Sequence, residues 1–554
     1  MLIRFIKFIR DSAPERFKPI LWTSAGAGVL EALVVAAIGM GVGEFSQTRT
    51  VPVRPLLLFL VSGLGYYFLF RKSMMESLLV ANDEVERRIA EVADRLRSIS
   101  YEAFSSIEQS KIYSVLLGNH DMVMEAARFL GSFIAGGFMI ALSFLYAATI
   151  SPSAAIFLFG IFAGMALAFA GMEKTLVASF RKRAQKEDAF FASLKDIVLG
   201  FVELKMNQAK SDAILKDRIM KLGDEYFRAR LETDAYQVRS TAFYMSFAFV
   251  PVGAIVFSLG EMLNLSGGQV AELSTLAMFA VTPVLGLCLF FPTAARAVMI
   301  LEQIEEFSNF LAERCDRDAG PAEPPKFDRI AVKDLRFTYP AVEGQTPFSI
   351  AVPEFELHRG ELVILRGSNG TGKSTFMRVF AGLLKAQQGT IAVNDIPVSV
   401  LGYSSYRRLF SIVFTDFYLF DGIYGEKVDP ARCEHYLKAL GLLGKVSIGP
   451  DGRFSTTDLS SGQRKRLAVI SALLENRSIL LFDEVAADFD HYFREYFYEK
   501  LLPELKAEGR TILAISHDDR YFDVADRVVS MEEGHMRVWR DRKTDDAQKS
   551  RPQA

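Results

Sequence analysis

Long apolar runs fill the first three hundred positions of the chain and disappear from the remainder. A run of about 20 apolar residues can cross the roughly 30 Å hydrocarbon layer of a bilayer as a helix. The pattern predicts about six such helices, the second of them short. They lie at residues 19–43, 55–70, 129–150, 153–171, 242–259 and 276–300.

The Lys and Arg residues between these runs predict their orientation, because positive charge is retained on the cytoplasmic side. Basic residues are frequent after the second and fourth runs, whereas "TISPS" and "EMLNLSGGQVAELS" contain none. We therefore expect six spans with both termini in the cytoplasm. The long basic segments 72–117 and 172–200 contain almost no Gly or Pro, so the spans should continue into the cytosol as helices.

The pattern changes at "CDRDAGPAEPPK", where Gly, Pro and charge replace apolar periodicity. Beyond it, short β-rich runs such as "ELVILRG", "RSILLFDE" and "RTILAISH" alternate with helices. Nearly continuous apolar strands of this kind are typical of a parallel sheet covered on both faces. The predicted division is a membrane domain at 1–312, a linker at 313–326, an α/β domain at 327–540 and a flexible tail at 541–554.

Composition agrees with a membrane protein, because half of the 554 residues are hydrophobic. The formal net charge of −2 excludes a nucleic-acid binder that works through a large basic surface. The three cysteines are far apart, so neither a disulfide framework nor a zinc site is expected. The opening segment "MLIRFIKFIR" predicts a basic amphipathic helix along the membrane surface.

The sequence "GSNGTGKST" fits the phosphate-loop pattern G-x-x-x-x-G-K-[ST] between an apolar strand and a helix. Backbone N–H groups of such a loop converge on phosphates. Lys373 would neutralise the β- and γ-phosphates of ATP, and the Ser374 hydroxyl would bind Mg²⁺. The expected ATP-binding residues are Gly367, Ser368, Asn369, Gly370, Thr371, Gly372, Lys373, Ser374 and Thr375.

Two further segments end apolar strands with polar side chains. In "SILLFDE", Asp483 would hold Mg²⁺ through water and Glu484 would deprotonate the attacking water. In "AISHDD", His517 would reach the γ-phosphate. The alternative is that these are only solvated side chains at strand ends, and the phosphate loop upstream argues against it.

These motifs resemble the ATP-binding-cassette (ABC) family over residues 327–540, and the six spans resemble its exporters. The implied fold is an α-helical six-span transmembrane domain fused to an α/β P-loop ATP-binding-cassette domain. The resemblance implies that Tyr339 stacks on adenine and that residues 487–490, with Asp490, form the D-loop. It also implies a signature motif that contacts ATP of a second copy, namely Leu459, Ser460, Ser461, Gly462 and Gln463.

A better match to the family signature, "LSGGQ", stands at residues 265–269. It precedes the phosphate loop and lies between two predicted spans on the side away from the cytosol. We therefore interpret it as a coincidence in a short polar loop. The working signature should be "LSSGQ", in which Ser460 would cap a helix that points at a γ-phosphate.

This chain departs from most exporters in "FTDFYLF", where Thr415 occupies the position of the usual Gln. Threonine is shorter and reaches Mg²⁺ or water less easily, so either Thr415 or Asp416 takes that role. Segments 203–207 and 110–117 are candidates for coupling helices, against plain helix extension as the alternative. Glu31, midway along the first span, is expected to line the translocation pathway, unless it snorkels or pairs structurally.

The resemblance implies a homodimer in the bacterial inner membrane with two ATP molecules between the copies. The segments "VFTDFYLF", "DEVAADFD", "SHDDRYFDVADR" and "GFVELKMN" look like the subfamily that exports cyclic peptides and peptide siderophores. The expected substrate is therefore a cyclic or modified peptide, such as a siderophore or its precursor. A lipid or multidrug exporter is the first alternative, and a regulatory ATPase without transport is the second.

Overall fold

The computed structural model describes residues 2–48, 50–116, 120–316, 325–340 and 347–541. The chain forms two compact units. The first consists of Met1–Arg97 and Ile107–Arg314, and the second of Ser98–Ser106 and Cys315–Ala554. The second unit therefore contains a short segment from the first half of the chain, which the predicted division did not anticipate.

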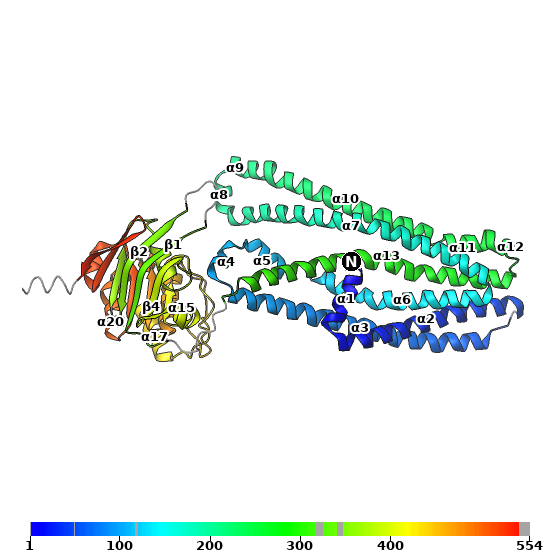
Figure 1. The fold of residues 1–554 in the computed structure, drawn as a ribbon, viewed down its shortest axis with the longest axis horizontal. Coiled ribbons are helices and arrows are strands. Elements are labelled where there is room, and N and C mark those ends of the chain that lie inside the picture. Colours follow the sequence, from blue (N-terminus) through cyan, green and yellow to red (C-terminus); the bar gives the residue numbers. More distant parts are fainter. Residues whose placement is uncertain (1, 49, 117–119, 317–324, 341–346, 542–554) are drawn as a thin grey trace, which may run out of the picture. The chain divides into compact units, whose positions relative to one another are not determined.

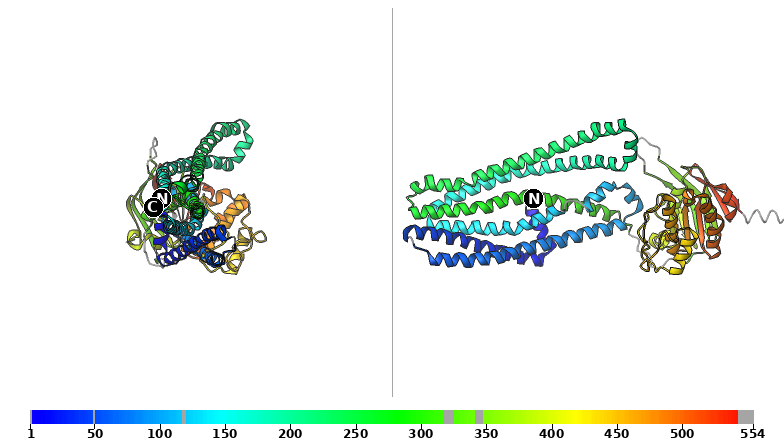
Figure 2. Two further views of the ribbon diagram at one scale, coloured as in Figure 1. Left: turned by 90° about the vertical axis from the view of Figure 1, so that its right-hand side faces the viewer. Right: turned by 180° about the vertical axis from the view of Figure 1, so that it is seen from behind.

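The first unit consists of helices, and the longest ones run side by side (Figures 1 and 2). Antiparallel α7 and α10 form a hairpin whose turn carries α8 and α9 (Figure 1). The bounds are α1 Leu2–Ser12, α2 Pro14–Thr48, α3 Val53–Ser98, α5 Gln109–Leu116, α6 Asp121–Ile150, α7 Pro152–Leu199, α8 Phe201–Met206, α9 Gln208–Ala213, the π-helix Ile214–Ile219, α10 Met220–Phe247, α11 Val250–Ala254, the π-helix Ile255–Leu259, α12 Gly260–Met262 and α13 Gly267–Glu313.

Four helices among the described residues are long and apolar enough to cross a membrane: Pro14–Phe45, Val53–Ser98, Asp121–Ile150 and Gln208–Met262. They contain the predicted spans 19–43, 55–70, 129–150 and 242–259. The other two predicted spans lie in α7 and α13, which include side chains outside the described set. The prediction of several apolar helices is confirmed, whereas the count of six is not.

The amphipathic helix predicted at the N-terminus forms as α1, but its apolar face contacts protein. Phe5 and Ile9 are completely buried in a cluster with residues of α3, α6 and α13. The Phe5 ring meets Phe290 of α13 edge-on at 6.1 Å. Protein therefore covers part of the apolar face, and the position of this helix along the membrane surface stays a prediction.

The second unit is built on a ten-stranded sheet with the order β5-β4-β1-β2-β10-β9-β3-β8-β7-β6. Strands β9, β3, β8, β7 and β6 are parallel to one another, and β1 pairs antiparallel with β2 and β4. The bounds are β1 Arg329–Thr338, β2 Ser349–His358, β3 Leu362–Arg366, β4 Gln388–Val393, β5 Ile396–Pro397, β6 Phe410–Val413, β7 Ile479–Asp483, β8 Thr511–Ile515, β9 Arg527–Glu532 and β10 His535–Asp541.

The parallel strands are buried on both faces, as their continuous apolar sequences predict. In β3, Leu362 and Ile364 enter one core cluster, whereas Val363 and Leu365 enter the other. Successive side chains of a strand point to opposite faces, so this alternation places a core on each side of the sheet. Because the apolar strands run parallel, their carboxyl ends gather the loops after β3, β7 and β8 at one edge.

Short helices cover the sheet and connect its strands (Figure 1). Their bounds are α14 Lys373–Phe380, α15 Val398–Leu401, α16 Tyr403–Arg407, α17 Pro430–Ala439, α18 Ser461–Leu474, the 3₁₀ turn η3 Val485–Asp488, α19 His491–Tyr496, the π-helix Phe497–Leu501, α20 Leu502–Ala507 and the 3₁₀ turn Asp519–Val524. The predicted tail beyond Asp541 lies outside the described residues.

Helix α4 (Tyr101–Ser106) joins the second unit through a clasp, which we define as residues 98–99 and 315–316. Ile99 forms an antiparallel bridge with Cys315, and the backbone N–H of Asp316 donates to the carbonyl oxygen of Ser98 at 2.8 Å. The Tyr101 side chain packs against the core cluster on one face of the sheet. The clasp thus fixes the end of α3 to the first residues of the predicted linker.

Candidate functional site

The phosphate loop connects β3 to α14, and its glycines are required by its geometry. Gly367 has φ +150°, and a Cβ atom there would lie 2.3 Å from the carbonyl oxygen of Met531. Gly372 has φ +101°, and its Cβ would lie 2.5 Å from the Ile350 side chain. A larger residue at either position would therefore push the loop off the sheet.

Lys373 lies under the loop with only 4% of its side chain exposed. Its Nζ donates to the carbonyl oxygens of Gly367 and Ser368 at 2.9 and 2.8 Å, and lies 3.8 Å from Glu484 Oε1. Burial lowers the pKa of Lys373, and the carboxylates of Glu484 and Asp483 oppose that change. The ammonium is thus poorly solvated and suited to bind an anion.

The two predicted carboxylates follow one another at the carboxyl end of β7. Asp483 is almost fully buried, and one of its oxygens accepts a hydrogen bond from Ser374 Oγ at 3.0 Å. Glu484 adopts a left-handed conformation with φ +50°, which turns the chain from the strand into η3. Its Oε1 lies 2.8 Å from His517 Nε2, so the imidazole predicted to act at the γ-phosphate contacts the predicted base.

The donor set fits a magnesium ion that accompanies ATP. The Ser374 hydroxyl and the Asp483 carboxylate are hard oxygen ligands, and Mg²⁺ is typically held by one or two such groups plus phosphates. Asp483 Oδ2 is buried without a hydrogen-bond partner in the described part of the chain. Burial raises the pKa of Asp483, and the Ser374 hydrogen bond opposes that change. A cation would satisfy the orphaned oxygen.

The cavity around the phosphate loop has a volume of about 480 Å³. It is lined by Phe348, Asn369, Gly370, Gly372, Lys373, Ser374, Thr375, Thr415 and Glu484. Phe348 was not among the predicted residues. It is partly exposed at the start of the segment leading into β2, and a lone aromatic residue there gave no signal in the sequence.

Thr415 and Asp416, the two candidates for the role of the missing glutamine, have different contacts. Thr415 lines the cavity, and its Oγ1 donates to the carbonyl oxygen of Asp483 at 3.1 Å. The Asp416 side chain is instead 71% exposed and accepts from Arg378 at 3.2 Å. Thr415 is therefore the residue brought to the phosphate site, and Asp416 contacts the flank of α14.

Tyr339 lies directly after β1 and packs against the core cluster, with its ring centroid 5.0 Å from that of Phe337. Its backbone N–H donates to the carbonyl oxygen of Phe348 at 3.0 Å. Tyr339 does not line the cavity, so Phe348 is the aromatic residue placed at the mouth of the phosphate loop. The predicted adenine contact of Tyr339 stays a prediction.

The predicted signature residues begin α18 and lie apart from the phosphate cavity of the same chain. Ser460 caps the helix by accepting from the N–H of Gln463 at 3.4 Å, and Gln463 Oε1 accepts from the N–H of Ser460 at 3.3 Å. Within the described residues, the lining of the cavity includes no part of 459–463. Asp490 likewise caps α19 and does not reach the cavity.

The second "LSGGQ" string forms the same local structure. Ser266 caps α13, accepts from the N–H of Gln269 at 3.3 Å, and donates its own N–H to Gln269 Oε1 at 2.9 Å. The expected short loop is present only at residues 263–266, because Ser-x-x-Gln satisfies two orphan N–H groups and starts a helix at Gly267. That helix belongs to the first unit, whereas the sheet with the phosphate loop belongs to the second.

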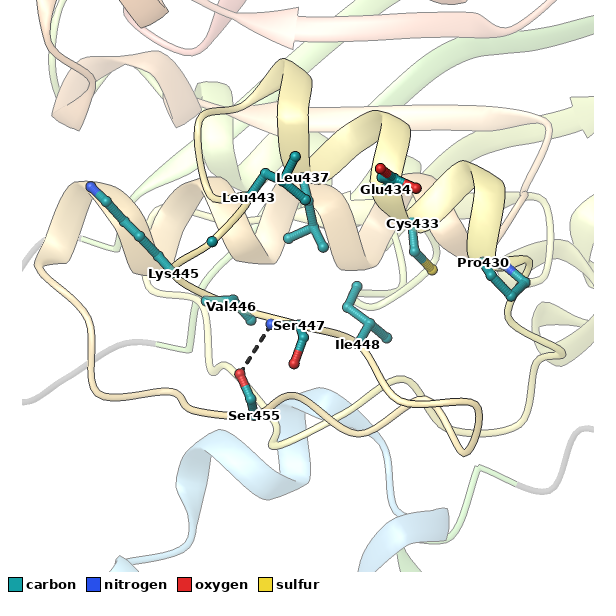
Figure 3. A pocket seen from close by; sticks show the side chains of 11 residues that line it. Pro430, Cys433, Glu434, Leu437, Leu443, Lys445, Val446, Ser447, Ile448 and Ser455 are labelled. Atoms are coloured by element: carbon teal, nitrogen blue, oxygen red, sulfur yellow. Dashed lines mark hydrogen bonds between the residues drawn. The ribbon is translucent and has the colours of Figure 1, made fainter.

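A different pocket of about 350 Å³ lies beside α17 and the loop that follows it (Figure 3). Leu437, Leu443 and Val446 line it together with Cys433 and Glu434. The hydrogen bond from the N–H of Ser447 to Ser455 Oγ, 3.0 Å long, crosses its edge (Figure 3). It shares no lining residue with the phosphate cavity.

Comparison with known proteins places this arrangement in context. Residues 351–487 match the sequence profile described as ABC transporter. The chain is 44% identical over 209 residues to the ATP-binding protein SyrD of Pseudomonas syringae pv. syringae, covering 37% of each chain. It is 30% identical over 191 residues to the ATP-binding protein HrtA of Staphylococcus aureus, covering 32% of this chain and 86% of HrtA.

A longer match extends into the helical unit. The chain is 25% identical over 359 residues to an ATP-dependent lipid A-core flippase of Thiobacillus denitrificans, covering 60% of this chain and 61% of the flippase. The matched regions thus span less than two thirds of SyrD and of the flippase.

Proposed function

Because the chain belongs to the ABC transporter family, we propose that it couples ATP hydrolysis in the second unit to export of a substrate by the helices of the first. The observation that carries this proposal is the phosphate cavity, where Lys373 and Ser374 from one loop meet Glu484 from another. The apolar helices in the same chain favour transport over a purely regulatory ATPase.

The proposed chemistry assigns one task to each group. Lys373 neutralises phosphate charge, and Glu484 accepts a proton from the water that attacks the γ-phosphorus, so the bond between that phosphorus and the leaving oxygen breaks. His517 holds the Glu484 carboxylate in place through the 2.8 Å contact. Ser374 and Asp483 would hold Mg²⁺, which supplies positive charge against the phosphate oxygens.

The position of the signature supports the proposal of a homodimer. Ser460 and Gly462 do not line the cavity of their own chain, so a second copy would supply them to complete each site. Two copies related by a two-fold axis would enclose two ATP molecules. We place this dimer in the bacterial inner membrane with both termini in the cytoplasm, because the basic segments 72–117 and 172–200 belong on that side.

The turn between α7 and α10 is a strong candidate for contact with a nucleotide-binding unit. Its apolar side chains are largely exposed, and α8 contains no buried residue. They are Val198, Leu199, Phe201, Val202 and Met206. Clustered exposed apolar side chains mark interaction sites. The proposed coupling segment 203–207 overlaps this turn, and the other proposed segment, 110–117, coincides with α5 up to Leu116.

Glu31 is proposed to line the translocation pathway. It is half-buried on α2. Helices α2 and α3 pack closely near Glu31. A Cβ on Gly65 would lie 2.9 Å from Leu30, and a Cβ on Gly26 would lie 2.9 Å from Leu69. Glu31→Gln should leave basal ATPase activity unchanged and alter transport. Unchanged transport, with unchanged pH dependence, in a folded variant would contradict this role.

The proposed substrate is a cyclic or modified peptide, on the basis of the resemblance of four segments to peptide and siderophore exporters. The match to a protein named as a lipid A-core flippase favours a lipid as the second candidate. Both are amphipathic molecules that a cavity between apolar helices can accept.

Transport into inverted membrane vesicles would test the proposal and separate the two substrates. We expect ATP-dependent uptake of a labelled cyclic peptide by the wild-type protein and none by Glu484→Gln. ATP-dependent translocation of a fluorescent lipid A analogue, without peptide uptake, would select the lipid. ATP hydrolysis that no peptide or lipid stimulates, with no uptake, would contradict export.

A further inference from the structure

Lys465 is a buried cation on the signature helix α18 that the proposed chemistry does not use. Only 1% of its side chain is exposed. Its Nζ lies 2.8 Å from Asp488 Oδ2 and donates to the carbonyl oxygen of Glu484 at 3.4 Å. A buried ammonium is costly to desolvate, and an apolar side chain of the same length would fill this space at lower cost. Its contacts therefore indicate a task beyond packing.

Both contacts of Lys465 lie on the turn that carries the proposed base. Glu484 begins this turn and Asp488 ends it, so one ammonium joins the two ends of η3. A second contact between the same elements occurs at Gly462, where a Cβ would lie only 2.8 Å from the carbonyl oxygen of Asp488. The first turns of α18 thus hold η3 at both of its ends.

The backbone of this turn sets the direction of the Glu484 carboxylate. A non-glycine residue at φ +50° persists only where its surroundings hold it. Val485 and Ala486 are buried in the core, and Lys465 binds the carbonyl oxygen of Glu484 itself. On the other side, the Glu484 carboxylate meets His517. A shift of α18 would therefore move the base relative to the phosphate loop.

We propose that Lys465 is a positioning residue that links the two ATP sites of the dimer. The inference rests on the proposed function, in which Ser460 and Gly462 at the start of α18 contact ATP bound to the partner copy. When the start of α18 binds ATP held by the partner copy, the position of α18 is fixed. Through its contacts, Lys465 then fixes the position of Glu484 in the same chain. Occupation of one site thereby prepares the base of the other.

A substitution series on the full-length protein in detergent tests this link. Lys465→Met removes the ammonium at similar length, and Lys465→Gln keeps an N–H donor for the Glu484 carbonyl. Lys506→Met is the control, because Lys506, although 35% exposed, also pairs with an aspartate in the same unit, and that aspartate, Asp526, does not line the phosphate cavity. The readouts are ATP affinity, kcat and the Hill coefficient for ATP.

The wild type should hydrolyse ATP with a Hill coefficient above 1. Lys465→Met should bind ATP within twofold of the wild type, lose about 10- to 100-fold in kcat because the base is misplaced, and show a Hill coefficient of 1. Lys465→Gln should recover part of the kcat, and Lys506→Met should keep both values.

Three outcomes would contradict the link. A non-cooperative wild type would overturn it, as would a folded Lys465→Met with wild-type kcat and Hill coefficient. Equal effects of Lys465→Met and Lys506→Met would reduce Lys465 to a structural role. If the wild type hydrolyses no ATP, the proposed function itself fails and the inference falls with it.

Discussion

Glu484 is the central residue of the proposed reaction, because its carboxylate contacts both His517 Nε2 and Lys373 Nζ. Glu484→Gln keeps the shape and the contact with His517 but cannot accept a proton. We expect ATP binding to persist while hydrolysis falls by about 10²- to 10⁴-fold, the range for losing acid–base assistance. Radiolabelled ATP binding and phosphate release measure the two effects. Wild-type turnover would remove Glu484 from the role of base.

The two capping boxes offer a matched test of the signature. Ser460→Asp preserves the cap, because aspartate is as good an N-cap as serine, but sets a carboxylate where a phosphate would bind. ATPase activity should fall by about 10²- to 10³-fold, by analogy with lost oxyanion donors. Ser266→Asp makes the identical change at the cap of α13 and should leave ATPase activity in detergent close to wild type.

A charged substitution at Gly462 in the same signature, such as Gly462→Glu, would be a less specific test than Ser460→Asp. A side chain at position 462 would also clash with the carbonyl oxygen of Asp488, so loss of activity there would combine charge with a steric effect. If Ser266→Asp abolished hydrolysis and Ser460→Asp did not, the choice between the two strings would be reversed.

Residue types alone identified most of the phosphate cavity. Gly372, Lys373 and Ser374 follow a strand at a fixed spacing, and that spacing predicts the conformation of the phosphate loop. Phe348 and the difference between Thr415 and Asp416 could not be predicted in the same way. Both depend on the directions of side chains in the segments after β6 and before β2. These segments have no periodic sequence pattern from which the directions could be predicted.

Among the elements, the continuous apolar strands predicted the sheet, and the cap assigned to Ser460 predicted the start of α18. The attachment of α4 could not be predicted, because it depends on a bridge between Ile99 and Cys315 more than two hundred positions apart. The same limit applies to α1, whose amphipathic pattern is compatible with lipid or with protein. Burial of Phe5 and Ile9 shows that protein covers part of the apolar face.

The clasp that holds α4 depends on Asp316, whose carboxylate is 10% exposed. Lys385 donates to one oxygen at 2.7 Å and Arg407 to the other at 2.9 Å. Burial by itself raises the pKa of Asp316, but these two cations outweigh burial and lower the pKa below its usual value. The carboxylate therefore stabilises the fold above the usual carboxyl range, and this contribution is lost as pH falls through the lowered pKa.

Asp316→Asn should reduce stability at neutral pH by about 1 to 2 kcal/mol, since each hydrogen bond loses its charge. For a unit of this size, that corresponds to a fall in Tm of a few degrees, about 2 to 4 °C per kcal/mol. The difference from wild type should shrink as pH falls below the usual carboxyl range and disappear once pH is below the lowered pKa of Asp316, where the wild-type carboxyl is also protonated in the folded protein. A difference in Tm that is independent of pH would show that shape rather than charge matters at this position.

In the proposed dimer, two copies complete each other's ATP sites. Lys373 and Ser460 are predicted to act on the same ATP but from different chains. Two inactivating changes should therefore have different effects according to whether they lie on one chain or on two. The changes are Lys373→Ala and Ser460→Asp.

The most direct measurement compares two differently tagged heterodimers purified to homogeneity. One pairs a Lys373→Ala chain with a Ser460→Asp chain, and the other pairs a wild-type chain with a chain that carries both changes. If the sites are shared, the first heterodimer retains one intact site and hydrolyses ATP, whereas the second has none. If each chain used its own signature, the result would be reversed: the second heterodimer would be active and the first would not.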